Sequence, residues 1–514
     1  MKRKEDAITS RKMRALESNA QYFGVSRLQL MENAGHAVAK EIVSRFKPDT
    51  PVTIFCGLGG NGGDGFVAAR HLASLGFKVE VILAGKPEEI SDEAALQNWN
   101  ALQPLTETIS TCEVYDTKLI PAEIHAKIIV DALLGTGAKG KLRPPIIQMV
   151  KKMNSLNAFR FAIDVPTGID SDTGQILGDA TKADCTITFY KTKTGLNETT
   201  KQCGELLVKD IGLPPELENY AGPGDVLLTT RKRYPQSHKG DFGRLLVIGG
   251  NETYSGAPAL VALAAQRTGT DLVYIATPES TAYAISSMSP DLITVKLEGT
   301  HLNPDNVLTL KSYIERVDAV AIGPGLGLHP ETKKTVKLII ELAQKVDKSV
   351  LLDADGLKAF AGFTSQLKTS IVLTPHAGEY AALSGNKPSN DLTERIVEVD
   401  KCAAKLNAVI LLKGAVDIIS NGQRHKLNFT GNPGMTVGGT GDVLSGIVAA
   451  FLAQHVDPFE SAVAGAFVNG AAGDFVYQEK GYHMSASDLI QWIPPILDDP
   501  MSHLQVRRPF ARPH

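Results

Sequence analysis

Short apolar runs alternate with helical patterns along most of the chain, and this alternation constrains the fold more than any other feature. In the first half the runs cover residues 52–55, 79–83, 128–130, 161–163 and 185–189, the last of the series. Such runs are typical of buried strands in a parallel sheet with helices on both faces. Residues 6–47 and 66–75 carry the apolar spacing of helices. Loops that follow the strands of such a sheet are where ligands bind.

A second alternating series predicts a second, larger α/β domain. Its runs cover residues 245–248, 272–276, 319–322, 350–352, 371–374 and 409–412. A chain of 514 residues is too long for one ordinary core. Prolines and glycines interrupt the pattern between the two series, which predicts a linker. The expected boundaries are 1–212 for the first domain, 213–233 for the linker, 234–504 for the second domain and 505–514 for a loosely ordered tail.

Composition and charge narrow the class of protein. The formal net charge is −3 and no lysine–arginine cluster stands out, so nucleic acid is not an expected partner. No apolar run is long enough to span a bilayer, and MKRKEDAITS is not followed by a signal-peptide core. The five cysteines never form CxxC, which argues against disulfides or a zinc site. We expect a soluble, cytoplasmic homo-oligomer that acts on small molecules.

A glycine-rich loop stands directly before an apolar helical run in the second domain. It reads GGTGD and consists of Gly438, Gly439, Thr440, Gly441 and Asp442. The free N–H groups and the dipole of a helix start can hold a phosphate or a developing negative charge. Asp442 would then accept a proton from a substrate hydroxyl, while the amides stabilise the transferred group. The alternative is that Asp442 only caps the helix and the glycines only turn the chain.

Three interpretations are possible for the polar strand ends of the first domain. Gly57, Gly59 and Gly62 satisfy the GxGxxG fingerprint of a dinucleotide site, but Glu80 is expected inside its strand rather than at its end. Alternatively, oxygens at successive strand ends bind a hard monovalent cation, with a nearby carboxylate transferring a proton. The residues in question are Asn61, Asp131 and Thr167 for the cation and Asp164 for the proton. As a third possibility, these residues only form turns and helix caps.

Several strand ends of the second domain carry charged or glycine residues. These are Asp353, His376, Glu379, Lys413 and the GPGLG turn at 323–327, and Lys239 lies nearer the start of the domain. Each could be a surface or capping residue. Together they provide what a phosphoryl-transfer cleft needs, namely cations and turns that let a backbone approach phosphate. The chain lacks GxxxxGK[ST], which excludes an ordinary P-loop kinase.

The motifs resemble those of the bifunctional NAD(P)H-hydrate repair enzymes over nearly the whole length. In the first half they are LMENAG (30–35), NGGDGFVAAR (61–70), DALLGTG (131–137) and DVPTGID (164–170). In the second half they are SHKGDFG (237–243), YSGAP (254–258), GPGLG, LTPHAGE (373–379), LLKGA (411–415) and GGTGD. The resemblance implies a Rossmann-like doubly wound first domain and a ribokinase-like α/β second domain.

The resemblance also implies two activities. The first domain would be an epimerase that interconverts the R and S hydrates of NADH and NADPH (NADHX and NADPHX). The second would dehydrate the S form with ADP or ATP and Mg²⁺, after phosphorylation of the C6 hydroxyl with Asp442 as base. One alternative is a ribokinase-type kinase for a small alcohol or vitamin, fused to a nicotinamide-binding domain. Another is that the first domain only senses dinucleotides.

Site residues follow from the same resemblance. The epimerase pocket would comprise Gly60, Asn61, Gly62, Gly63, Asp64, Gly135, Thr136, Gly137, Ala138, Lys139, Gly140, Lys141 and Asp164, with potassium on Asn61, Asp131 and Thr167. The hydrate in the dehydratase would contact Ala257, Gly325, His376 and Asp442. The adenine nucleotide would contact Lys413, Gly414, Ala415, Val416, Asp417, Asn432, Pro433, Gly434, Gly438, Gly439, Thr440 and Gly441. Gly60 replaces the family's usual asparagine and Thr167 a common serine.

Overall fold

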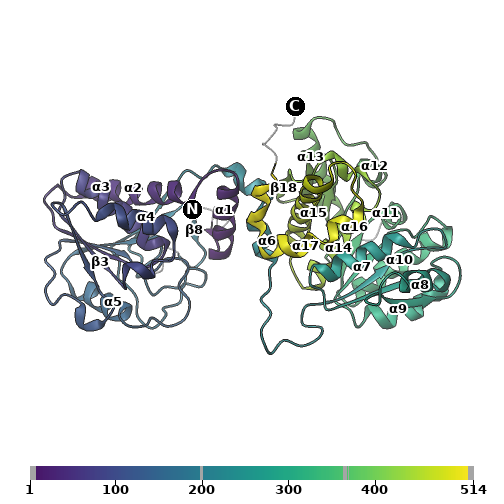
Figure 1. Ribbon diagram of the computed structural model, residues 1–514, viewed down its shortest axis with the longest axis horizontal. Coiled ribbons are helices and arrows are strands. Elements are labelled where there is room, and N and C mark those ends of the chain that lie inside the picture. Colours follow the sequence, from purple (N-terminus) through teal and green to yellow (C-terminus); the bar gives the residue numbers. More distant parts are fainter. Residues whose placement is uncertain (1–6, 197–200, 363–366, 368–369, 508–514) are drawn as a thin grey trace. The chain divides into compact units, whose positions relative to one another are not determined.

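The chain folds into two compact units, Met1–Pro215 and Glu216–His514 (Figure 1). The computed structural model describes residues 7–196, 201–362, 367 and 370–507. The boundary between the units lies inside the segment predicted as a linker, which also contains helix α6 (Pro223–Thr229). Of the predicted tail, residues 508–514 lie outside the described residues, whereas Gln505 ends a short 3-10 helix (Pro500–Gln505).

The first unit contains a parallel sheet, which has seven strands among the described residues. Their order is β4 (Ile109–Glu113), β3 (Val79–Leu83), β2 (Val52–Cys56), β5 (Ile128–Ala132), β6 (Phe159–Ile163), β7 (Cys185–Phe189) and β9 (Glu205–Lys209). Counted along the chain this is the order 3-2-1-4-5-6 of a Rossmann sheet with one further strand, so the predicted Rossmann-like fold is confirmed. The order reverses between β2 and β5, which opens a crevice at the carboxyl ends of these two strands.

Helices cover both faces of this sheet. Helices α2 (Arg27–Arg45), α3 (Gly60–Ser74) and α4 (Glu93–Leu102) lie on one face, and α5 (Ile146–Ser155) lies on the other (Figure 1). The helix predicted over 6–47 is interrupted, because α1 (Ser10–Tyr22) ends before Gly24, which has a φ of 100°. A capping box of Ser26 and Gln29 then starts α2.

Two further predictions for the first unit need correction. Helix α3 begins at Gly60 and not at residue 66, because its glycines permit close packing: a Cβ at Gly62 would lie 1.9 Å from the carbonyl oxygen of Gly57. The strand at 185–189 is not the last, since β9 follows it. Strand β9 and the equally unpredicted β4 lie at the two edges of the sheet and are partly exposed. Strand β4 (ISTCE) has no apolar run, whereas β9 (ELLVK) has a short one at 206–208 that is not among the predicted strands. A separate two-stranded pair joins β1 (Ala7–Ile8) to β8 (Thr192–Lys193).

The second unit contains a sheet with nine strands among its described residues. The order is β12 (Ile293–Leu297), β11 (Leu272–Pro278), β10 (Arg244–Ile248), β13 (Ala319–Ile322), β14 (Ser349–Leu352), β15 (Ile371–Leu373), β16 (Val409–Leu412), β17 (Asp417–Ser420) and β18 (His425–Asn428). The strands from β12 to β16 are parallel, and β17 and β18 continue the sheet antiparallel. The six predicted strands are confirmed, and the order again reverses between β10 and β13.

Alternate residues of the central strands face opposite helical layers. Leu246 and Ile248 belong to a core with α9 (Val307–Ile314), α10 (Pro330–Lys345) and α13 (Leu392–Leu406). Their neighbours Leu245 and Val247 belong to a core with α7 (Gly256–Arg267), α14 (Thr440–Ala453) and α15 (Pro458–Lys480). The helix predicted after GGTGD is therefore confirmed as a buried element. The remaining α-helices are α8 (Glu279–Ser286), α11 (Ala354–Phe360), α12 (Ala377–Ser384), α16 (Ala486–Ile490) and α17 (Ile493–Asp498).

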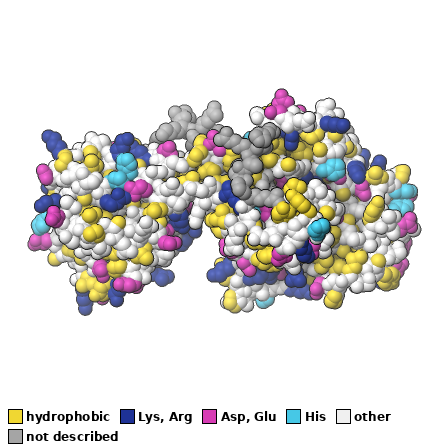
Figure 2. Space-filling view, turned by 45° about the horizontal axis from the view of Figure 1, so that its top comes forward, with side chains coloured by type: hydrophobic (Ala, Val, Ile, Leu, Met, Phe, Trp, Pro, Cys, Tyr) yellow, Lys and Arg dark blue, Asp and Glu magenta, His cyan; other side chains and the backbone are white. Residues whose placement is uncertain are grey.

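The surface is mixed in character. Figure 2 shows acidic, basic and apolar side chains interspersed on the visible face of the first unit. Among the helices that the structure describes, none combines the length and the apolar character needed to span a bilayer.

Candidate active sites

A cavity of about 400 Å³ lies at the crevice of the first sheet. Its wall combines the start of α3, the loop after β5, the end of β6 and side chains of α1 and α2. The predicted substrate residues in the wall are Gly60, Asn61, Asp64, Gly135, Thr136, Gly137, Ala138 and Asp164. The structure thus brings most of the predicted epimerase residues to one cavity, at the position where ligands bind in such sheets.

Other predicted residues lie outside the cavity wall. Gly62 packs on the backbone of the preceding loop, and a Cβ at Gly63 would lie 2.5 Å from the sulfur of Met31. Lys139 extends toward Asp170 and Asp172, at 3.9 and 3.7 Å. Gly140, which has a φ of 73°, and the exposed Lys141 do not line the cavity either.

Asp164 is held by an ion pair that sequence reasoning missed. It follows β6 directly and has a φ of 64°, a left-handed backbone conformation that residues other than glycine rarely adopt. Its Oδ1 lies 2.6 Å from Nζ of Lys193, and the hydroxyl of Thr188 donates to the same oxygen at 3.1 Å. Lys193 is only 1% exposed and also donates to the carbonyl of Phe189. A buried ammonium group therefore fixes the carboxylate that faces the cavity.

Two more carboxyl groups line the same cavity. Burial raises the pKa of Glu17, and the neighbouring Asp164 charge raises it further. Burial likewise raises the pKa of Asp64 well above its usual range, again with help from Asp164, while Arg27 acts in the opposite direction. The cavity therefore combines a carboxylate in an ion pair with two carboxyl groups of raised pKa, which is the contrast of environments that acid–base chemistry uses.

The predicted cation ligands are partly assembled. Asp131 is fully buried in β5 and accepts hydrogen bonds from the N–H and hydroxyl of Thr167 at 2.8 and 2.7 Å. The N–H of Leu134 donates to the Thr167 hydroxyl oxygen at 3.0 Å. Asn61 lies close to Gly135, the residue after Leu134: a Cβ at Gly135 would lie 3.1 Å from Oδ1 of Asn61. The hard oxygen donors that a monovalent cation prefers therefore border one loop.

These contacts decide against the capping interpretation. Asp131 lies within a strand, and Asp164 follows a strand in a left-handed conformation, so neither begins a helix. Asn61 lies in the first turn of α3 and not in a loop. Burial raises the pKa of Asp131 despite its hydrogen bonds, so a cation beside it would offset a real energetic cost.

The dinucleotide fingerprint is also incomplete. A Cβ at Gly57 would lie 1.9 Å from the carbonyl oxygen of Leu133, so this glycine permits two loops to touch. Glu80 lies inside β3, as predicted, and accepts a hydrogen bond from Thr53 at 2.9 Å. It is therefore not at the strand end, where a fingerprint carboxylate would meet a ribose.

In the second unit, the start of α14 forms a candidate anion site. Gly439 is the N-cap with a φ of 99°, and Asp442 stands in the first helical turn. Asp442 is therefore not the helix cap, whereas Gly439 does turn the chain, as the alternative interpretation held. Burial raises the pKa of Asp442 to about 7, with a further contribution from Asp353 and an opposing one from Lys413. A carboxyl group with this pKa can exchange a proton near neutral pH.

Lys413 lies against the start of the same helix. Its ammonium group donates to Oδ1 of Asp353 at 2.9 Å, and the hydroxyl of Ser445 donates to Oδ2 at 2.8 Å. A Cβ at Gly441 would lie 3.4 Å from the Lys413 nitrogen. The ends of β14 and β16 and the start of α14 therefore meet. The Lys413 ammonium lies beside the first turn of α14, and both its charge and the amides of that turn are close to Asp442.

His376 has a structural role beside this site. It is the N-cap of α12, where its Nδ1 accepts from the N–H of Gly378 at 2.9 Å, and its Nε2 lies 3.4 Å from Glu379. Its backbone pairs with that of Lys413. The capping interpretation is thus correct for His376, although the residue also adjoins the candidate anion site.

The segments predicted to bind the nucleotide extend from the same edge. Gly414 donates its N–H to Asp417, whose pKa burial raises to about 6. Asn432 is fixed to α15 through the carbonyl of Gly473 and the carboxylate of Asp474. The hydroxyl of Thr440 bonds the carbonyls of the short helix Pro433–Thr436 and its cap, so this helix is tied to the GGTGD loop.

The loops after β10 and β13 complete the edge. A Cβ at Gly325 would lie 3.5 Å from Cβ of Ala257, and one at Gly323 would meet the carbonyl oxygen of Asp353 at 1.8 Å. A Cβ at Gly439 would lie 2.8 Å from Cδ1 of Leu260 in α7. Lys239 differs, because it precedes β10 in an exposed segment and so lies toward the opposite edge of the sheet.

Comparison with known proteins identifies the family of each unit. The family model described as NAD(P)H-hydrate dehydratase matches residues 245–495, and that described as YjeF-related protein N-terminus matches residues 27–195. The chain is 47% identical to the bifunctional NAD(P)H-hydrate repair enzyme Nnr of Pyrobaculum aerophilum over 96% of this chain and 98% of that protein. The chain belongs to the bifunctional NAD(P)H-hydrate repair enzyme family. The predicted resemblance is thereby confirmed.

Solved structures similar to the second unit are known. A ribokinase-like superfamily protein from Enterococcus faecalis is 27% identical, with a TM-score of 0.48, over 55% of this chain and 95% of that chain. The ADP/ATP-dependent NAD(P)H-hydrate dehydratase of Bacillus subtilis, co-crystallised with ATP and Mg²⁺, is 26% identical, with a TM-score of 0.46, over 55% of this chain and 99% of that chain.

Proposed function

We propose that the first unit epimerises the R and S hydrates of NADH and NADPH, and that the second dehydrates the S form at the expense of ADP or ATP. Family membership supports the pair of activities. The observation that carries the proposal is that each unit has its own site at the carboxyl edge of its own sheet, with different chemistry. One site holds Asp164 paired with a buried lysine, and the other holds Asp442 at a helix start beside Lys413.

In the second unit, the C6 hydroxyl of the hydrate attacks the terminal phosphoryl group of the nucleotide. Asp442 takes the hydroxyl proton, while the amides of Gly438 to Gly441 and the Lys413 ammonium stabilise the transferred group. Phosphate then leaves C6 more readily than hydroxide would, and loss of a C5 proton restores the double bond of NAD(P)H. The products are NAD(P)H, phosphate and the nucleotide that has lost its terminal phosphoryl group.

Magnesium fits this site as a partner of the nucleotide. It would be held mainly by phosphate and water oxygens, which is its usual coordination, and would neutralise phosphate charge. Asp353 keeps free lone pairs beside its bonds to Lys413 and Ser445, so it is suited to bind the ion through water.

In the first unit, inversion at C6 requires that a bond to this carbon breaks and re-forms. C6 carries both a hydroxyl and the ring nitrogen N1, so it is the carbon of a hemiaminal. Asp164 removes the hydroxyl proton, the N1–C6 bond opens to an aldehyde, and a neutral carboxyl group of Glu17 or Asp64 protonates N1. Rotation of the aldehyde and closure on its other face give the opposite epimer and return both protons.

Potassium belongs to this proposal as a structural ion of the first unit. Asn61, Asp131 and Thr167 would hold it, and the ion would supply positive charge beside the buried Asp131. The amide nitrogen of Asn61 is buried without a hydrogen-bond partner. Because this nitrogen makes no hydrogen bond, the amide can turn its oxygen toward an ion beside the loop without losing one.

Single substitutions can test the two activities separately. With mixed NADH hydrate and ADP or ATP, Asp442→Asn should abolish recovery of NADH absorbance but leave epimer exchange, seen by chromatography, intact. Asp164→Asn should stop epimer exchange and leave dehydration of the S form intact. Asp498→Asn, on an exposed carboxylate, is the matched control and should change neither.

Two outcomes would contradict this assignment. Loss of both activities in either variant would argue against independent sites. A stable phosphorylated product, with no NADH formed, would instead support the small-alcohol kinase. The homo-oligomeric state and the cytoplasmic location stay predictions, to be checked by light scattering and by cell fractionation.

A further inference from the structure

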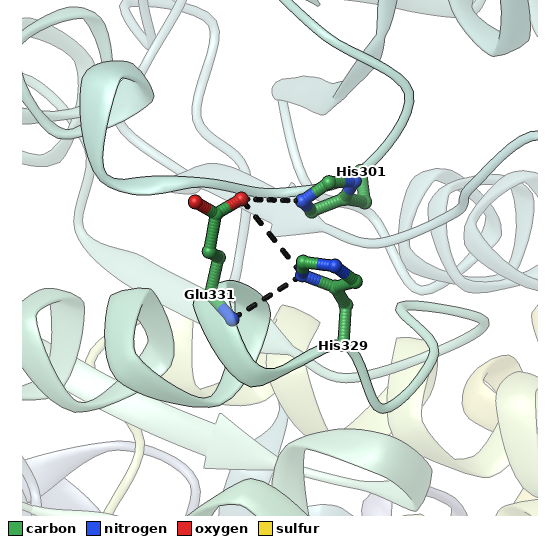
Figure 3. A group of neighbouring side chains, drawn as sticks. All are labelled: His301, His329 and Glu331. Carbon is green, nitrogen blue, oxygen red and sulfur yellow. Dashed lines mark hydrogen bonds and ion pairs between the residues drawn. The ribbon is translucent and has the colours of Figure 1, made fainter.

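Two histidines and a glutamate converge on the second unit, at residues that neither proposed activity uses. His301 lies in the loop after β12, and His329 and Glu331 stand at the start of α10 (Figure 3). In Figure 3 a nitrogen of each imidazole ring points toward the same carboxylate. Their candidate ligand atoms all lie within 4.8 Å of one another. Imidazole nitrogen and carboxylate oxygen are ligands that divalent transition metals prefer.

The spacing of these atoms suits a tetrahedral ion. Zinc bonds to nitrogen and oxygen are about 2.0–2.2 Å long, so neighbouring ligands of a tetrahedral zinc lie about 3.3 Å apart. Nε2 of His301 lies 2.8 Å from Oε2 of Glu331, and Nδ1 of His329 lies 3.8 Å from the same oxygen. These distances lie on either side of the ideal value, so small side-chain rotations would admit the ion.

The hydrogen bonds around the cluster orient the two rings. Nδ1 of His301 lies 3.3 Å from the hydroxyl of Thr300, so the other ring nitrogen is the one that faces Glu331. Nδ1 of His329 accepts only a long hydrogen bond, of 3.3 Å, from the N–H of Glu331. An imidazole nitrogen has a single lone pair, so a bound ion would take the place of this weak bond. A hydrogen bond to the outer ring nitrogen, like that of His301, is typical of metal-binding histidines.

An ion pair and a helix cap explain only part of this arrangement. The His301–Glu331 pair accounts for one ring and the N-cap of α10 accounts for the other. Neither interaction requires the two rings to lie together, with centroids 3.9 Å apart. A shared cation would hold both rings at one place, with both in the neutral form.

We propose that His301, His329 and Glu331 bind one divalent transition-metal ion, with zinc as the best fit and water completing its coordination. The ion links the loop after β12 to the start of α10. His329 lies shortly after Gly327, whose N–H donates to Asp355, and after Gly325 of the GPGLG turn. The site therefore fixes the far end of the turn that borders the second active site. This proposal stands independently of either enzymatic activity.

Metal binding by the full chain tests the proposal. After removal of metals by a chelator, equilibrium dialysis against Zn²⁺ should show one ion more per chain in the unchanged protein than in His301→Gln or His329→Asn. Asparagine can still cap α10, so the second variant isolates the loss of the ligand. Affinity at this site should fall roughly 100-fold or more in either variant, since even outer-sphere partners cost 10–100-fold.

A matched control and a spectroscopic measurement make the result specific. His125→Ala removes an exposed histidine that lies 3.5 Å from Glu123 with no second ring in the pair, and it should leave the stoichiometry unchanged. Co²⁺ at the site should give the intense visible bands of tetrahedral coordination, and these should be absent in both variants. Equal Zn²⁺ stoichiometry in the variants and the unchanged protein, with circular dichroism showing all of them folded, would overturn the proposal.

Discussion

Asp442→Asn should make the second unit more stable at pH 8 while strongly slowing its reaction. The pKa of Asp442 is raised from 3.8 to about 7, chiefly by burial. A rise of about 3 units, at about 1.4 kcal/mol per unit, costs up to about 4 kcal/mol of folding free energy when the group is fully ionised. The side chain keeps some contact with solvent, so this is an upper value. Asparagine keeps the shape and removes the charge.

The sign follows from the direction of the shift. Because the folded state holds this proton more tightly than the unfolded state, stability declines as the pH rises from about 4 to about 7 and then stays low. The Asp442→Asn variant lacks this loss. Its advantage over the unchanged protein should therefore be largest at pH 8, smaller at pH 6 and nearly absent at pH 4.

Tryptophan fluorescence can report on each unit separately. The chain has two tryptophans, Trp99 in α4 of the first unit and Trp492 in the second, where its ring stacks on Phe475 at 4.4 Å. In a Trp99→Phe background, urea unfolding followed through Trp492 measures the second unit. The midpoint of Asp442→Asn should exceed that of the parent at pH 8 and approach it at pH 4.

The same substitution should lower the dehydration rate by about 10² to 10⁴, the usual contribution of a general base. In the unchanged protein, kcat should rise with pH through about 7, since only the carboxylate form accepts a proton. A variant that is no more stable than the parent at pH 8 would refute the burial argument. A variant that still dehydrates the hydrate at the normal rate would refute the role as base.

Three further predictions concern residues around the two sites. Lys193→Met leaves Asp164 without its cation and should slow epimerisation by at least about 10²-fold, measured by chromatographic separation of the epimers. Dehydration of the S form should not change. Lys182→Met, at an exposed lysine, is the control and should change neither activity. Gly439→Ala strains a φ of 99° and brings a Cβ within 2.8 Å of its neighbours, so it should cost about 1–3 kcal/mol in urea unfolding and weaken nucleotide binding in calorimetry. Gly438→Ala meets nothing within 4 Å and should leave the unfolding midpoint unchanged; equal midpoints for the two variants would contradict the argument. Replacing potassium by choline should lower the melting temperature of the first unit, and Asp131→Asn should remove that difference; a potassium effect of the same size in the variant would place the ion elsewhere.

The strands that could be predicted are those buried on both faces. Strands β13 and β16 are fully buried and read as continuous apolar runs. Strands β4 and β12 lie at sheet edges, where polar side chains interrupt the apolar ones, so ISTCE and ITVKL give no such run. The edge strand β9 does contain a short apolar run, at 206–208, and is within reach of the same reasoning. The start of α3 was missed for another reason. Its glycines indicate a loop by propensity, but close packing against neighbouring backbone makes them helical.

The site residues divide along the same physical line. Asp164 and Lys413 could be found because parallel strands place their carboxyl ends at one edge, so a polar residue after a strand is a candidate. Lys193 and Glu17 could not be found this way, since they reach the cavity from β8 and α1, which do not belong to that sheet. Ser445 was likewise invisible, because its bond to Asp353 spans a long separation in the sequence.

The two units show that the position of a site and its chemistry have separate origins. In both sheets the strand order reverses beside the first strand, between β2 and β5 and between β10 and β13, and each site borders that reversal. The fold alone therefore accounts for where the ligands would bind. What each carboxylate does depends on its partner. Asp164 touches the Lys193 ammonium at 2.6 Å. Burial raises the pKa of Asp442 to about 7, and Lys413, the lysine that acts against this rise, is bonded to Asp353 instead. The chemistry of each site therefore comes from the side chains that its loops place around the carboxylate, and not from the strand order that the two sheets share.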